Sequence, residues 1–465
     1  MNSYKKLLNN SFLFAIGNFG SKIILLLLVP LYTYYLTTAE YGFVDLITTS
    51  TILLLPIVSA NVFDAVLRFT MDKEESQSQV LSNSLFVAAL GSIAAVSLYP
   101  LLSLLKIDQD MLNYTYVILL LQVFQNILSQ FARGLGKIKV FAINGIWMTL
   151  VMSIANVILL TRYDMGIAGY LLSIVIANVA SIGYLVVALK IWRFLDLSHI
   201  NKPLVKTMLA YALPIIPNSI MWWLISASNR YFILGFLTAS ANGIYAVANK
   251  VPAILSLVTS IFTQSWQLSA IEEYESEYKS EFYSKVFSYY SSLLFLGTSS
   301  ILVVLKLFMA SFIAPEYYEA WQSVPFLLLG VVFSSFSAFL GTNYLAAKET
   351  RGVFRTSVYG GAASLVLNYL LIPYFGLIGA GVANMISFAI MWILRIFDTK
   401  RYIVIVMNTQ IMIANLVLVG CQIGILFLNL KFESLIEMLF FALVFANNRE
   451  LLSPLKGLVK SRMKK

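Results

Sequence analysis

The stretch Lys206 to Phe236, KTMLAYALPIIPNSIMWWLISASNRYFILGF, decides the fold class. A helix needs about 20 apolar residues to cross the hydrocarbon core, so this stretch is long enough to span a bilayer. Pro214 and Pro217 predict a break near its start. Its polar residues recur at i, i+4, i+7 and i+11: Ser219, Trp223, Ser226 and Arg230. A guanidinium inside a bilayer is costly unless it faces protein or water, so this face is expected to line a cavity.

Composition points to an integral membrane protein. Hydrophobic residues make up 59% of the 465, charged residues only 12%, and the mean hydropathy is +0.82. The first apolar run, 12 to 35, is too long for a signal-peptide core, so it is expected to remain as a span. The net charge of +10 suits cytoplasmic loops better than a nucleic-acid partner. One cysteine, Cys421, and one histidine, His199, exclude disulfide frameworks and His- or Cys-based metal sites; no catalytic or metal-binding residue is predicted.

Apolar segments predict about 14 transmembrane helices, all-α. The predicted spans are 12 to 35, 42 to 67, 80 to 105, 112 to 133, 140 to 161, 166 to 190, 207 to 236, 242 to 269, 286 to 312, 321 to 345, 353 to 374, 377 to 397, 403 to 429 and 434 to 448. Most Lys and Arg residues lie on the side of the two termini, which predicts that both termini are cytoplasmic. The opposite connections are short and hold only Lys106, Arg162, Lys306 and Lys431. The acidic connection 271 to 285 predicts a helix on the membrane surface.

An internal repeat divides the chain. TTAEYGFVDL resembles TASANGIYAV, and NVILLTRYDMGIAGYLLS from Asn156 resembles NYLLIPYFGLIGAGVAN from Asn368. The paired glycines are Gly42 with Gly243, Gly166 with Gly376, and Gly169 with Gly379. Two parallel copies of six spans predict an N-lobe over 1–200 and a C-lobe over 201–402, around a central cleft. Residues 403–465 would add two extra helices, nearly free of charge, and a basic cytoplasmic tail.

Polar residues inside the spans form stripes that are expected to line the cleft. The cavity-lining candidates, which include two tryptophans able to pack on sugar rings, are Asn18, Asn61, Asn126, Asn218, Trp222, Trp223, Asn249, Thr263 and Gln267. The cationic candidates are Lys22, Arg68, Arg133, Arg230 and Lys250. A lining of amides, hydroxyls and cations suits a ligand with many hydroxyls and a phosphate.

The cationic candidates also have structural interpretations. Lys22 lies about 16 Å along its helix, which is too deep for easy snorkelling and favours a functional cation over a partner for Asp64. Arg68 and Arg133 lie near cytoplasmic helix ends, where a structural role and a ligand-binding role are equally favoured. Asp64 and Arg68 are spaced for a local ion pair.

The candidates near the outer face have alternatives of the same kind. Arg230 and Lys250 could reach the interface or pair with Asp45, although Arg230 completes a polar stripe. The two tryptophans, Trp222 and Trp223, fall at the repeat position of Lys22, where simple packing is the commoner role.

Several motifs, taken in order, resemble the polysaccharide repeat-unit flippases. These are the Wzx-type oligosaccharidyl-lipid transporters of the multidrug/oligosaccharidyl-lipid/polysaccharide (MOP) exporter superfamily. The matching motifs are AEYG from Ala39, AVLRF from Ala65, ALPIIPNSIMWWLISASNRYFI from Ala212, GIAGY from Gly166 and GLIGAG from Gly376. The resemblance implies a MATE-like fold of two six-helix lobes plus two C-terminal helices. It also implies alternating access in the bacterial cell membrane, with an undecaprenyl-pyrophosphate-linked oligosaccharide moving from the cytoplasmic to the outer leaflet.

The resemblance assigns roles to residues as well. The lipid's pyrophosphate would be bound by the five cations, chiefly Lys22, Arg68 and Arg133, although no strict arginine triad is evident. The last two helices would border a groove for the lipid tail. The implied partners are the lipid-linked oligosaccharide of a capsule, exopolysaccharide or O-antigen pathway, membrane lipids, and the glycosyltransferases and polymerase of that pathway. No cofactor is expected; for coupling to protons, Na⁺ or the membrane potential, Asp45 and Asp64 are the acidic candidates in the early spans.

Two other function classes stay open. A cation- or proton-coupled drug antiporter of the same superfamily would keep the fold, but would be expected to carry a carboxylate in the first or seventh span, and neither has one. A membrane-embedded polysaccharide polymerase would need a sizeable outer loop, so the chain is not expected to be an enzyme. Nothing in the stripes encodes the identity of the sugar.

Overall fold

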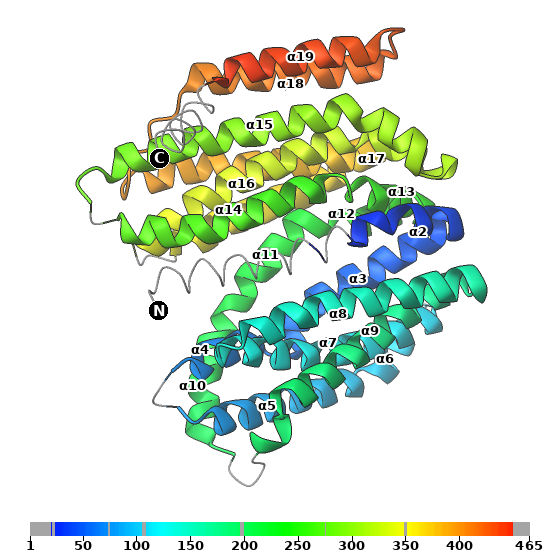
Figure 1. The fold of residues 1–465 in the computed structure, drawn as a ribbon, viewed down its shortest axis with the longest axis vertical. Coiled ribbons are helices and arrows are strands. Elements are labelled where there is room, and N and C mark those ends of the chain that lie inside the picture. Colours follow the sequence, from blue (N-terminus) through cyan, green and yellow to red (C-terminus); the bar gives the residue numbers. More distant parts are fainter. Residues whose placement is uncertain are drawn as a thin grey trace, which may run out of the picture. The chain divides into compact units, whose positions relative to one another are not determined.

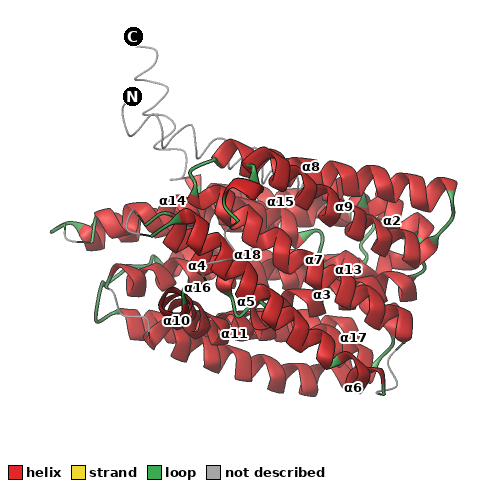
Figure 2. Ribbon diagram, turned by 90° about the horizontal axis from the view of Figure 1, so that it is seen from below, coloured by secondary structure: helices red, strands yellow, loops and turns green. Residues whose placement is uncertain are grey.

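The computed structural model describes residues 20, 24–72, 75–104, 108–195, 200–274, 276–347 and 351–449. Within these ranges the regular structure is entirely helical (Figures 1 and 2). Ten described helices are long and apolar enough to cross a membrane, or eleven if the bent pair Ala239–Ala248 and Pro252–Ile271 forms one span. This confirms an all-α multi-pass membrane protein, while the predicted number of fourteen spans is not reached by this count.

The chain forms two compact units, Met1–Trp223 and Leu224–Lys465. The first contains α2 (Val29–Tyr35), α3 (Thr38–Val58), α4 (Val62–Thr70), α5 (Gln77–Ser97), α6 (Tyr99–Ser103), α7 (Gln109–Gly134), α8 (Ile138–Val157), α9 (Gly166–Leu189), α10 (Lys202–Ala212) and most of α11 (Ile216–Ala227). The second contains α12 (Asn229–Phe236), α13 (Ala239–Ala248), α14 (Pro252–Glu272), α15 (Lys279–Phe312), α16 (Val324–Ala346), α17 (Arg351–Thr399), α18 (Thr409–Leu428) and α19 (Glu433–Asn447). The predicted boundaries at 200 and 402 stay predictions.

Helix α7 is the centre of the first unit. It packs against α3, α4, α5, α8 and α9. Fully buried apolar side chains fill the space between these helices, among them Val66, Val123, Ile127 and Phe131. The backbone that carries the polar side chains of α4 and α7 is therefore fixed by a well-packed apolar core.

The second predicted span is not one helix. It breaks after α3 at Ser59, and Ala60 and Asn61 both adopt positive φ, 48° and 52°. An asparagine tolerates this left-handed conformation better than most residues because its amide bonds locally. Here the Asn61 Nδ2 donates to Asp64 Oδ2 at 3.0 Å, one turn into α4. The break therefore sets the direction of α4 and the polar residues it carries.

The stretch that decides the fold breaks where its prolines predict. Helix α10 ends at Ala212, a 3-10 turn over Leu213–Ile215 contains Pro214, and α11 begins at Ile216. Proline lacks the N–H that a continuous helix requires, so the break is intrinsic to the sequence. A second interruption at Ser228 separates α11 from α12.

Paired turns of the internal repeat have the same local structure. Thr37 and Thr238 both cap helices, accepting from Glu40 N in α3 and from Ala241 N in α13. Gly166 and Gly376 both have positive φ, 50° and 57°. After the turn at Gly376 the two halves of α17 pass close to each other at Gly379, where an added Cβ would lie 2.4 Å from the Leu371 oxygen. Helix α17 is thus a tight hairpin of two predicted spans, which explains its 49 residues, about 74 Å if straight.

Within the second unit, α16 packs against α14 and α17, and α15 packs against α18 and α19 (Figure 1). The predicted surface helix between 271 and 285 is wrong. Helix α14 runs to Glu272 and α15 already begins at Lys279, so the acidic connection is shorter and the basic end of that segment belongs to α15.

Candidate functional site

The candidate site of the first unit lies on α4 and α7, and we call Asn61, Asp64, Arg68, Asn126 and Arg133 the α4–α7 polar site. The two helices meet closely at one end, because a Cβ on Gly134 would lie 2.6 Å from the Thr70 Cβ. Arg68 and Arg133 each occupy the last turn of their helix. The carbonyl end of a helix favours a cation, so both positions suit arginine electrostatically.

Arg133 is held in place by three neighbours. Its Nη1 donates to Gln130 Oε1 at 3.0 Å, and its Cζ lies 5.2 Å from the centroid of the Phe141 ring. It also interacts electrostatically with Asp64 across the α4–α7 contact. The side chain is half-buried, so its guanidinium is positioned while part of it stays accessible.

Arg68 is the more exposed member of the pair. Its Nη1 lies 3.7 Å from Asp72 Oδ2, with side chains 59% and 37% exposed, so the ion pair forms with Asp72 and not with Asp64 as the spacing suggested. An exposed pair of this kind contributes about 0–1 kcal/mol, so a phosphate could replace Asp72 at little cost. An open polar cavity of about 780 Å³ adjoins this end of the helices, with Asp72, Gly134 and Arg193 among its lining residues.

The remaining candidates of the first unit are spread along its helices. Asn126 is half-buried two turns before Arg133, and its amide donates to the Gln122 carbonyl at 2.9 Å. Asp45 lies on α3 beside Tyr41, far along the helix from the α4–α7 polar site. Lys22 and Asn18 lie outside the described residues.

Helix α11 carries three candidates near the end of this unit. Trp223 Nε1 donates to the Thr49 carbonyl at 3.0 Å, which ties α11 to α3. Trp222 is half-buried. The Asn218 side-chain oxygen is buried and has no hydrogen-bond partner among the described residues, so it is an acceptor available to a ligand hydroxyl.

Candidates in the second unit have mixed surroundings. Arg230 is 8% exposed; its Nη1 donates to Ser226 O at 2.8 Å and to Asn229 Oδ1 at 2.9 Å, and its Cζ lies 5.5 Å from the Tyr245 ring centroid. These contacts link α11, α12 and α13, which gives Arg230 a structural role. Lys250 is half-buried at the α13–α14 bend.

The other polar candidates of this unit follow the same bend and α14. Asn249 is half-buried, and its amide donates to the Tyr245 carbonyl at 2.7 Å. Along α14, Thr263 is half-buried and Gln267 is exposed.

A second buried arginine, Arg395, is not among the site residues predicted from the sequence. Arg395 is 1% exposed on α17 and donates from three nitrogens, to Thr356 Oγ1 at 3.0 Å, Ser337 O at 2.7 Å and Ser357 Oγ at 3.2 Å. It therefore ties the two halves of α17 to each other and to α16. The sequence signal was present, since Arg395 falls inside the predicted span 377 to 397.

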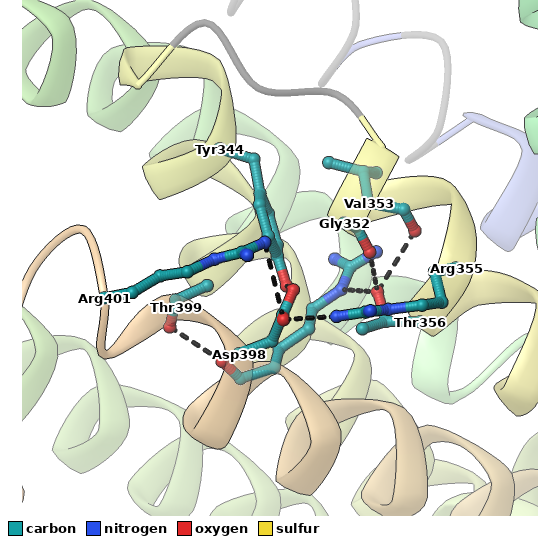
Figure 3. A network of polar contacts seen from close by, with 9 residues as sticks. Tyr344, Gly352, Val353, Arg355, Thr356, Asp398, Thr399 and Arg401 are labelled. Carbon is teal, nitrogen blue, oxygen red and sulfur yellow. Dashed lines mark hydrogen bonds and ion pairs between the residues drawn. The ribbon is translucent and has the colours of Figure 1, made fainter.

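Asp398, one turn after Arg395, is the centre of the neighbouring ion pairs (Figure 3). It accepts from Tyr344 OH at 2.7 Å, pairs with Arg355 and lies 3.5 Å from Arg401. The cluster closes one end of the α16–α17 contact, so we assign it a structural role and not a ligand site.

Comparisons with known proteins agree with this architecture. The sequence profile of the family described as "Polysaccharide biosynthesis protein" matches residues 7–267. A curated relative, "Uncharacterized membrane protein MJ1068" of Methanocaldococcus jannaschii, is 27% identical over 252 residues. That match covers 50% of this chain and 49% of the relative, so it spans about half the relative's length.

Solved structures share the fold over nearly the whole chain. One described as "Lipid II flippase MurJ, inward closed conformation" has a TM-score of 0.74 at 14% identity, covering 96% of this chain and all of that one. An outward-facing multidrug resistance MATE family transporter of the MOP superfamily has a TM-score of 0.60 at 13% identity, covering 85% and 95%. At these identities the likeness shows the fold alone, and it confirms the predicted MOP fold.

Proposed function

The chain belongs to the polysaccharide biosynthesis protein family, and from this premise we propose that it is a flippase for an undecaprenyl-pyrophosphate-linked oligosaccharide. The lipid would move from the cytoplasmic to the outer leaflet of the bacterial cell membrane, with both termini of the chain in the cytoplasm. The likeness to a structure described as a lipid II flippase supports this proposal, because that protein is named for moving a lipid.

The observation that carries the proposal is the placement of Arg68 and Arg133 at the ends of two adjoining helices. Each has a carboxylate neighbour that an anion can replace, Asp72 at 3.7 Å for Arg68 and Asp64 for Arg133. Guanidinium groups match phosphate oxygens with paired N–H donors, and such charge-assisted bonds are the strong ones. We propose that both arginines bind the pyrophosphate, with Lys22 as a third cation.

The sugar would be bound by amides and indole rings. Asn218 offers a buried oxygen without a partner among the described residues, and Asn126 follows the same face of α7 as Arg133. Trp222 is the half-buried aromatic nearest in sequence to Asn218 on α11. These groups bind hydroxyls and ring faces without selecting a particular sugar, so they suit a carrier of repeat units.

The transport step follows from these contacts. An inward-open state would admit the headgroup while the polyprenyl chain stays in lipid, and a change of state would re-expose the headgroup outside. A ligand shifts such an equilibrium only through different affinity for the two states, so the arginines must hold the anion more tightly in one of them. The inside-negative potential favours export of an anion by about 2.3 kcal/mol per charge per 100 mV.

The experiment that tests the proposal measures lipid-linked oligosaccharide by leaflet in cells depleted of this protein. A membrane-impermeant lectin on intact cells reports the outer leaflet, and lysed cells report the total. Inner-leaflet accumulation, relieved by the wild-type chain and not by the Arg68→Ala, Arg133→Ala double variant, supports a flippase with this headgroup site. An unchanged leaflet distribution on depletion overturns it.

A further inference from the structure

A buried carboxyl group lies between the two C-terminal helices and α15, where the sequence predicted almost no charge. Glu437 of α19 is 1% exposed. Gln422 of α18 and Ser299 of α15, which face it, are fully buried. The three residues come from three helices that each pack against the other two (Figure 1).

Hydrogen bonds order this cluster in one direction. The Ser299 hydroxyl donates to Gln422 Oε1 at 2.7 Å, and Gln422 Nε2 donates to Glu437 Oε2 at 3.0 Å. The serine therefore fixes which end of the amide faces the carboxyl group. The other carboxyl oxygen, Oε1 of Glu437, is buried and has no hydrogen-bond partner within the part of the chain that the structure describes.

The charged groups that face Glu437 do not neutralise it. On α15 the nearest is Lys306, whose ammonium is already held by Glu433 Oε2 at 2.8 Å, Asn429 Oδ1 at 2.7 Å and the Leu426 carbonyl at 2.5 Å. On α19 the other charge is Glu433 itself, one turn away, and α18 has no charged residue between Thr409 and Leu428. Among the described residues, Glu437 therefore has one side-chain amide donor and no cation of its own.

This arrangement suits a neutral carboxyl group. An ionised carboxylate accepts several hydrogen bonds, and leaving one buried without them or a cation is expensive, so such groups take up a proton instead. The site has too few ligands for a metal cation, because it offers one carboxyl and one amide group, and no group of three metal-binding side chains occurs among the described residues. The ligand that fits is a single proton on Oε1.

We propose that Glu437 is a proton-binding site whose occupancy controls the docking of α18 and α19 on α15 and thereby couples transport to protons. With the proton on Oε1 the three helices pack as described. When water reaches the carboxyl group, the O–H bond breaks, the proton passes to water, and the anion disfavours the closed packing. The Lys306–Glu433 pair lies between Glu437 and the predicted outer surface. The path for a proton from Glu437 to water is therefore shorter on the outer side than on the cytoplasmic side. Coupling rests on the proposed flippase function, whereas the proton site does not.

The first test addresses the proton site alone. The full chain in lipid nanodiscs is examined by infrared difference spectroscopy between acid and alkaline solution. We expect a carboxylic C=O band that disappears in Glu437→Gln and persists in the matched variant Glu433→Gln. Glutamine keeps the size and hydrogen bonding of the protonated acid, so the variant should fold. A band that Glu437→Gln leaves unchanged overturns the site.

The second test addresses coupling. Proteoliposomes that contain a labelled undecaprenyl-pyrophosphate disaccharide are given an imposed pH gradient. With one proton per turnover, each unit of gradient should change the limiting leaflet ratio about tenfold in the wild type and leave it unchanged in Glu437→Gln. Gradient dependence that survives in Glu437→Gln overturns the coupling. If the wild type moves no lipid at all, the proposed function fails, while the infrared band still decides the proton site.

Discussion

Replacing Arg133 by alanine tests the headgroup site most sharply within the described residues. The guanidinium is pre-positioned by Gln130 and Phe141, so little ordering entropy is lost when it binds an anion. Removing one hydrogen bond to a charged group costs about 1.5–3 kcal/mol, which is about 10–150-fold in apparent affinity. Because the contact binds the ligand before and during movement, the apparent KM should rise more than the maximal rate falls.

The assay measures the initial rate of flipping against the density of labelled lipid-linked oligosaccharide in proteoliposomes. Arg133→Lys keeps the charge but loses the planar pair of donors, so its apparent KM should lie between those of wild type and Arg133→Ala. Arg162→Ala is the matched control, since Arg162 is exposed at the end of the π-helical segment Ile158–Arg162 that follows α8. An Arg133→Ala protein that is monodisperse, folded and has the apparent KM of the Arg162→Ala control would refute the assignment.

Three other predictions concern the fold and the remaining cation. Arg395→Ala should lower the free energy of unfolding by about 3–5 kcal/mol, because three buried oxygen acceptors lose their donor at about 1–3 kcal/mol each. The exposed Arg401→Ala should cost at most about 1 kcal/mol, so equal melting temperatures of the two variants in detergent would contradict the structural role of Arg395. Gly379→Ala should lower the free energy of unfolding by about 1–3 kcal/mol, because the added Cβ would lie 2.4 Å from a backbone oxygen. Gly420→Ala has open space for its Cβ and should be neutral or stabilising. If thermal unfolding in detergent found Gly379→Ala to be the more stable of the two variants, the hairpin packing would be contradicted. Lys22→Ala should abolish export without loss of membrane insertion, and full export by that variant in depleted cells would remove Lys22 from the site.

The sequence predicted the features that depend on local chemistry. Apolar runs of about 20 residues predicted the membrane helices, and Pro214 predicted the break before α11. The glycine pair Gly166 and Gly376 was found from its repeat spacing, and both residues indeed need positive φ. These features can be read from the sequence because an apolar segment in a bilayer has few alternatives to a helix, and a turn with positive φ accepts few residue types other than glycine.

Features that depend on contacts between distant segments were not predicted. The break at Asn61 follows Pro56 of α3, but its long-range contact was not predicted: the Asn61 amide also donates to the Ala212 carbonyl of α10 at 3.5 Å. The last two helices were predicted to be nearly free of charge, yet α19 carries Glu437, which is buried beside Gln422 of α18 and near Ser299 of α15. Arg395 stands near the end of a predicted span, and its burial depends on Thr356 and Ser337, which supply its partners from 39 and 58 residues away.

The central claim is tested most directly by offering two substrates to the purified chain in the same proteoliposomes. One is a labelled undecaprenyl-pyrophosphate oligosaccharide, read by an impermeant enzyme that cleaves only exposed headgroups, and the other is a small lipophilic cation of the kind that drug antiporters carry. The flippase account predicts headgroup exposure that requires the protein and fails in the Arg68→Ala, Arg133→Ala double variant, with no movement of the cation. Cation transport without headgroup exposure would contradict the account and favour the antiporter.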